Sequence, residues 1–160
     1  MDVNEQKIAV SETDRVENML PSRTFPACVK NLSTDQTRAL YGDICKKIVE
    51  LAIRADKPTP HENLEFGKKK ASLREQGVSS ARILSGFAYS TFLALLGRRA
   101  AKQGVIVRTV NPAFTSVIGK VNYMNRYSIT PHEAAALVIA RRAQRLSEKP
   151  DSASIAPPVP

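Results

Sequence analysis

The segment "SITPHEAAALVIARR" (128–142) decides how the chain is organised, because it reads as one helix that is apolar beyond its first turn. Thr130 is a suitable N-cap, and Pro131 suits the first helical position, where no backbone N–H donor is needed. The Ala, Leu, Val and Ile residues that follow predict a helix buried against the rest of the fold. His132 and Glu133 lie in the opening turn, where Glu133 fits as an ordinary first-turn acid that interacts with the helix dipole.

The rest of the chain alternates between short β-like runs and longer helical ones. Ser33 and Gln36 form a capping box that opens a helix of about 22 residues, which ends at Asp56. The run 105–112 is almost continuously apolar, which is typical of a strand buried on both faces, and 113–128 is predicted to be a loop. The other predicted elements are a first strand ending at Asp2, strands in 7–13, 19–26 (an edge strand) and 59–66, and a helix at about 79–102.

The resulting order, β-β-β-α-β-α-β-α, predicts an α/β fold. Its sheet is expected to be mixed, with an antiparallel N-terminal half, parallel later strands and flanking helices. Residues 1–147 are assigned to one domain, since a chain of this length can bury its own core. Residues 148–160 hold four prolines and little apolar surface, so we expect a disordered tail.

Positive charge is concentrated in the later part of the chain. Residues 1–66 contain 9 Lys and Arg against 11 Asp and Glu, a net charge of −2, whereas residues 67–160 contain 15 against 4, a net charge of +11. This asymmetry favours a polyanionic partner such as nucleic acid over a merely solvated basic surface. No apolar run approaches the roughly 20 residues that cross a bilayer, and no signal-peptide core is evident, so no membrane association and a cytoplasmic location are expected.

The two cysteines do not indicate a zinc site or a disulfide framework. Cys28 and Cys45 are far apart in the sequence, and neither belongs to a C-x-x-C pair. Both are predicted to be small buried apolar residues.

Three polar residues fall at the ends of predicted core elements: Asp2 after the first strand, Glu62 after a later strand, and His132 at the start of the last helix. Such ends can converge on one patch of an α/β sheet, where neighbouring carboxylates need cations between them. Oxygen ligands and a neutral imidazole suit Mg²⁺ or Mn²⁺, and two such ions about 3.5–4 Å apart can act on a phosphodiester. The pattern alone equally allows Asp2, Glu62 and His132 to be solvated surface residues.

Five sequence blocks resemble those of TnpB-like transposon proteins and occur in the same order. The blocks are "DVN" (2–4), "ENLEFGKKK" (62–70), "ARILSGFAYSTF" (81–92), "VNPAFTSVIG" (110–119) and "HEAAALVIARR" (132–142). The resemblance covers nearly the whole chain up to about residue 148. It implies a RuvC-like nuclease domain with an RNase H-like fold, hence a transposase-type DNA endonuclease that uses Mg²⁺ or Mn²⁺. The family's relation to RNA-guided endonucleases implies a guide RNA for a full-length protein.

Carried across position by position, the resemblance implies that Asp2, Glu62 and His132 are the catalytic metal ligands. The third position is usually Asp in this fold, although some RuvC-like resolvases have His there. Asn4 resembles the family's "D-x-N" partner and is expected to order Asp2 by a hydrogen bond. The implied nucleic-acid contacts are Lys68, Lys69, Lys70, Arg98, Arg99, Arg108, Arg141 and Arg142.

The chain also departs from the family pattern. The apolar strand expected before the first Asp is missing, Pro60 is a poor residue for a central strand, and zinc-ribbon cysteines are absent. We therefore expect a truncated C-terminal part of such a protein, with weak activity or none. The alternatives are a catalytically inactive nucleic-acid-binding remnant and a basic α/β protein that binds an acidic protein.

Overall fold

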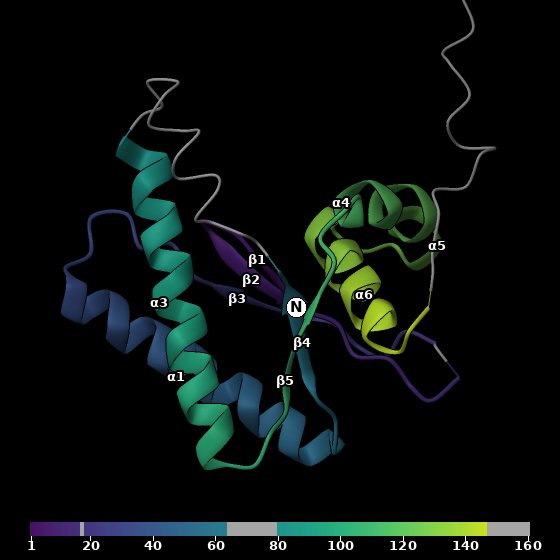
Figure 1. The fold of residues 1–160 in the computed structure, drawn as a ribbon. Coiled ribbons are helices and arrows are strands. Elements are labelled where there is room, and N and C mark those ends of the chain that lie inside the picture. The colour runs from purple at the N-terminus through teal and green to yellow at the C-terminus, as the bar shows by residue number, and fades with distance from the viewer. Residues whose placement is uncertain (17, 64–79, 147–160) are drawn as a thin grey trace, which may run out of the picture.

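A computed structural model describes residues 1–16, 18–63 and 80–146, with the side chains of 80–85 left out (Figure 1). It is a mixed α/β fold, as the order of the predicted elements indicated. The Pro-rich segment 148–160 and the three lysines 68–70 lie outside the described residues.

The N-terminal strands form the predicted antiparallel sheet. Strands β1 (Asp2–Val3), β2 (Lys7–Val10) and β3 (Arg23–Pro26) lie in that order, so β3 is an edge strand as expected. Asp2 begins β1 rather than ending it, and it pairs with Ala9 of β2.

A parallel pair of strands lies beside β1. Strand β4 (Thr59–Glu62) pairs with β5 (Val107–Val110), and the amino group of Met1 donates a hydrogen bond to the Pro60 carbonyl at 3.0 Å. On either side of Pro60, the backbone N–H of Thr59 donates to Ile106, just before β5, and that of Asn63 donates to Val110. Because donors alternate along a strand, the missing N–H of Pro60 falls on the side away from β5, and the proline is tolerated.

The prediction that the strand at 105–112 is buried on both faces is wrong. Arg108 and Thr109 are exposed in β5. Within the described part of the chain β5 pairs only with β4, so it is an edge strand, and Arg108 and Thr109, which are consecutive, expose side chains on both of its faces.

Two long helices cover one face of the strands (Figure 1). Helix α1 (Thr34–Ala55) begins with the predicted Ser33–Gln36 capping box, and α3 (Ser80–Lys102) packs against it. Their shared core includes Phe92, which is 0% exposed and packs edge-on against Tyr41 with ring centroids 5.4 Å apart. Of the cysteines, Cys45 is buried in this core as predicted, whereas Cys28 is exposed.

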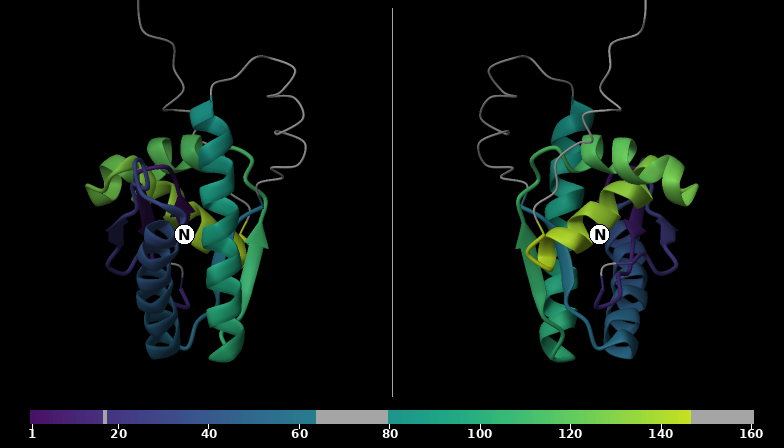
Figure 2. Two further views of the ribbon diagram at one scale, coloured as in Figure 1. Left: turned by 90° about the vertical axis from the view of Figure 1, so that its left-hand side faces the viewer. Right: turned by 90° about the vertical axis from the view of Figure 1, so that its right-hand side faces the viewer.

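A second helical layer covers the other face, and the prediction of a loop at 113–128 is wrong. This segment forms α4 (Thr115–Ile118), the π-helix η1 (Gly119–Met124) and α5 (Asn125–Tyr127), followed by α6 (Pro131–Ala143) with Thr130 as its N-cap. Ile118 and Tyr123 are buried against the apolar side of α6, so tertiary packing stabilises helices that the local pattern does not indicate. Figure 2 shows the two layers from opposite sides, with α1 and α3 in front in one view and α6 in front in the other.

None of the helices in the described ranges is long and apolar enough to cross a membrane.

Candidate functional site

The alternation of side chains along the strands directs acidic groups toward α6. Val3 and Ile8 belong to the core under α1 and α3, whereas Asp2, the neighbour of Val3 in β1, contacts α6 through His132. Ala9, the partner of Asp2, is completely buried. Successive side chains in a strand point to opposite faces, so one face of β1 contributes to the core and the other carries Asp2.

Asp2 and His132 are in direct contact although 130 positions separate them in the sequence. The Asp2 Oδ2 atom lies 2.8 Å from Nδ1 of His132, and the two side chains are 13% and 40% exposed. The Nδ2 atom of Asn4 lies 3.0 Å from the same ring nitrogen. A ring nitrogen cannot both donate to Asp2 and accept from Asn4, and we assign the hydrogen to the bond with the carboxylate, the stronger acceptor.

With the hydrogen so placed, the Asn4 amide lies beside the His132 ring without donating to it, which differs from the expected "D-x-N" hydrogen bond to Asp2. Its Oδ1 atom accepts hydrogen bonds from the backbone N–H groups of Gln6 and Lys7, at 3.0 and 3.1 Å. These bonds hold the tight connection between β1 and β2 and direct the amide nitrogen of Asn4 toward the imidazole.

Glu62 is held from both helical layers. Its carboxylate accepts a hydrogen bond from the hydroxyl of Thr115 in α4, and its backbone carbonyl accepts one from the Tyr89 hydroxyl in α3 at 3.1 Å. Burial raises the pKa of Glu62, the Thr115 hydrogen bond opposes that rise, and the negative charge of Asp2 adds to it. Asp2 and Glu62 lie on the neighbouring strands β1 and β4, which places the two negative charges on the same part of the fold.

The groups around Glu62 include three that sequence reasoning missed: His61, Tyr89 and Thr115. His61 is buried, its Nδ1 lies 2.8 Å from the Glu62 carbonyl oxygen, and burial lowers the pKa of its ring. Burial also raises the pKa of Tyr89, and the negative charges of Glu62 and Asp2 act in the same direction. The position of His61 next to Glu62 was a signal in the sequence, but Thr115 comes close only because α4 folds back over β4.

The three predicted ligands lie on one side of the strands but do not form a complete metal cluster. Across the described ranges, no group of three His, Cys, Asp or Glu side chains is placed to hold a metal ion. Asp2 and His132 make a pair, and the Glu62 carboxylate is directed to Thr115. Two carboxylates and an imidazole are nevertheless a donor set that fits Mg²⁺ or Mn²⁺.

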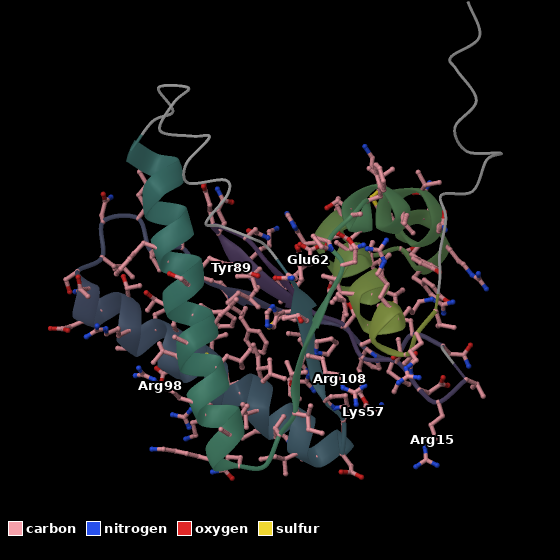
Figure 3. The ribbon with its side chains drawn as sticks, in the orientation of Figure 1. Arg15, Lys57, Glu62, Tyr89, Arg98 and Arg108 are labelled. Carbon is pink, nitrogen blue, oxygen red and sulfur yellow. The ribbon has the colours of Figure 1, made fainter. Side chains whose placement is uncertain are left out.

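Among the predicted cationic contacts that the structure describes, the charge of Arg142 acts to lower the pKa of Glu62, whereas Arg98, Arg99 and Arg108 are not grouped around this site. Arg98 and Arg99 are exposed near the C-terminal end of α3, and Figure 3 shows Arg98 beside the lower half of that helix while Glu62 lies at the upper end of β4. Exposed Arg108 is in mid-strand in β5.

Two of the predicted contacts make internal interactions instead. Arg142 donates hydrogen bonds to the carbonyl oxygens of Asn111 and Ala113, at 2.5 and 2.6 Å, and so ties α6 to the connection between β5 and α4. The guanidinium of Arg141 lies over the ring of Tyr123, 5.4 Å from its centroid.

Glu133 has the structural role that its position predicts. It completes a capping box with Thr130, and its carboxylate also accepts a hydrogen bond from Ser22 at 2.6 Å. Burial acts to raise the pKa of Glu133, but the hydrogen bonds from Ser22 and Thr130 outweigh it and lower the pKa.

In comparisons with known proteins, no family model, curated protein or solved structure matches the chain.

Proposed function

We propose that the chain is a metal-dependent nuclease domain with an RNase H-like, RuvC-like fold, of the kind found in TnpB-like transposon proteins. The topology supports this: three antiparallel strands lead through α1 to β4, which lies beside β1 and runs parallel to β5. In a fold of that kind the first strand is central, and helices cover both faces.

The observation that carries the proposal is the contact of Asp2 with His132, with Glu62 nearby on the adjacent strand. Asp2, Glu62 and His132 would hold Mg²⁺ or Mn²⁺. Such ions supply an activated water and neutralise the charge that develops on the phosphate during cleavage. The hydrogen bond from Nδ1 to Asp2 orients the His132 ring, and in the neutral ring it leaves the lone pair on Nε2 for a cation. Thr115 orients the Glu62 carboxylate.

The substrate that this proposal favours is DNA in a transposition or recombination reaction, directed by a guide RNA where the domain is part of a longer protein. The net charge of +11 over residues 67–160 supports a polyanionic substrate.

Cleavage of labelled single-stranded DNA by the purified chain, with Mg²⁺ or Mn²⁺, tests the proposal. We expect Asp2→Asn and Glu62→Gln to reduce the rate by about 100-fold or more, because misplacing the reacting groups by about 1 Å already costs that much. Glu133→Gln is a matched control: it removes the charge of the acid next to His132, yet glutamine can keep the capping box. The proposal is wrong if the wild-type chain does not cleave with either ion, or if the two site variants cleave at the same rate as the Glu133→Gln control.

A second candidate is a nucleic-acid-binding domain that does not cleave. It is favoured by the absence, within the described ranges, of a complete three-residue metal cluster. It predicts binding that weakens steeply with salt, no cleavage with either ion, and no effect of Asp2→Asn on affinity.

A further inference from the structure

Phe114 has a backbone conformation that its side chain disfavours. It precedes α4 with φ 59° and ψ 14°, in the left-handed region. The other non-glycine residues with positive φ in the described ranges are all polar: Asn31, Asp56, Ser128 and Arg145. Asn and Asp tolerate this region because their short side chains bond locally, whereas a bulky aromatic residue there is an outlier.

Burial does not explain why a phenylalanine occupies this position. The residue is 71% exposed, among the most exposed of the large apolar residues described. Neither the backbone nor the packing of the free protein therefore favours phenylalanine at 114, and strain of this kind is typical of binding and catalytic sites.

The residues on both sides of Phe114 hold it in place. On one side, Arg142 binds the Ala113 and Asn111 carbonyls, and the Asn111 side chain accepts the Ala113 N–H at 2.8 Å. On the other side, Thr115 is 2% exposed and donates its hydroxyl to the Glu62 carboxylate. The ring is thus presented to solvent from a backbone that is anchored to the candidate site.

We propose that Phe114 is a stacking platform for an unpaired nucleobase of a single-stranded nucleic acid bound at the Glu62 site, an inference that rests on the function proposed above. An exposed aromatic ring offers a flat face to any base, so it binds strands without regard to sequence. A base inside a duplex already has neighbours on both faces, so the proposed ligand is a single strand or an extruded base. The positive charge of residues 67–160 attracts the phosphates, and Phe114 adds contact with the base.

The test is fluorescence anisotropy with the full chain and a labelled oligothymidine of about 20 nucleotides, in EDTA so that no cleavage occurs. Alanine substitution of a stacking residue costs about 1–3 kcal/mol per base, so Phe114→Ala should weaken binding by about 5- to 150-fold. The slope of affinity against salt should not change, because no charge is removed. An abasic strand of the same length should bind wild type and Phe114→Ala equally.

Two further variants separate binding from folding. Phe114→Asn should lose the same affinity while raising the thermal unfolding midpoint, since asparagine tolerates the left-handed backbone. Phe87→Ala removes a comparably exposed phenylalanine, 58% against 71%, and should bind as wild type does. Phe87 is two residues from Tyr89, which places the two side chains on nearly opposite sides of α3.

The inference is overturned if Phe114→Ala binds oligothymidine as wild type does, if it loses equal affinity for the abasic strand, or if wild type prefers duplex or binds only an acidic protein. Because these measurements need no metal ion, a failure of cleavage alone leaves the stacking result intact. The two proposals therefore fail separately.

Discussion

The two helical layers of this fold are built in different ways, and the side chains of Asp2, Glu62 and His132 meet partners on the side of α4 and α6. Under α1 and α3 the core is made of large side chains, among them Phe92, Ile48 and Leu96. On the other side, α6 contributes a buried run of Ala134 to Ala140. Small residues let helices approach closely. The second layer is therefore packed through close approach of its backbones, whereas the first is packed through the volume of its side chains.

This difference in packing explains the positions of the polar groups Asp2, His132 and Glu62. A close-packed alanine-rich helix leaves its opening turn near the strands, where His132 meets Asp2. Glu62 joins the two layers, because α4 holds its carboxylate and α3 holds its carbonyl.

The largest effect is expected from the side-chain core. Phe92→Ala should lower the free energy of unfolding by about 3–5 kcal/mol, because Phe92 is fully buried and packs on Tyr41. Urea denaturation measures this. Phe87→Ala on the same helix is the control and should stay within about 0.5 kcal/mol of wild type, since Phe87 is exposed. Equal losses would contradict the assignment of Phe92 to the core.

Glycine substitutions test the closeness of the second layer. A Cβ atom at Gly119 would lie 2.6 Å from the backbone carbon of Ala134 and 2.7 Å from the backbone nitrogen of Ala135, so Gly119→Ala should destabilise the protein by about 1–3 kcal/mol. Gly97 in α3 has nothing within 4 Å of such an atom. Gly97→Ala should therefore raise stability by about 0.5–1 kcal/mol through helix propensity. A tolerated Gly119→Ala would mean that α6 and η1 are not in close contact.

The two hydrogen bonds that hold Glu62 can be removed by separate substitutions. Thr115→Val removes the hydrogen bond that opposes the rise in the pKa of Glu62, so that pKa should rise further. Tyr89→Phe removes a bond to the carbonyl instead, and should leave the Glu62 pKa nearly unchanged while costing about 0.5–1.5 kcal/mol of stability. A carboxyl ¹³C NMR titration without divalent ions gives the pKa. An unchanged value in Thr115→Val would show that the hydroxyl does not act on the carboxylate.

The smallest effects concern the capping boxes, one in each layer. Glu133→Ala should cost about 1 kcal/mol near neutral pH, because the carboxylate caps α6 and binds Ser22. The pKa of Glu133 is lowered in the fold, so this contribution is present above the ordinary range of a glutamate and disappears as the pH falls through the lowered pKa. Gln36→Ala in α1 removes an uncharged cap and should have a cost independent of pH. Denaturation of both variants from pH 3 to 7 checks this, and a pH-independent loss in Glu133→Ala would argue against it.

Much of the fold follows from local patterns in the sequence. The capping box of α1, the stop at Asp56 and the Thr130 cap of α6 predict their elements because the forces involved act within a few residues. The β-like run that contains β2 is predicted in the same way. The antiparallel and parallel halves of the strand arrangement follow from the order of those elements.

Other features of the fold and of the site depend on contacts between residues far apart in the sequence. Residues 115–127 are helical because Ile118 and Tyr123 are buried against α6, and β5 is half exposed because of its place at the edge of the strands. Likewise, the hydrogen bond from Arg142 to the Ala113 carbonyl and the one from Thr115 to the Glu62 carboxylate exist because distant segments pack together. These outcomes depend on which segments pack together, and local sequence patterns do not determine the energies of contacts between residues far apart in the chain.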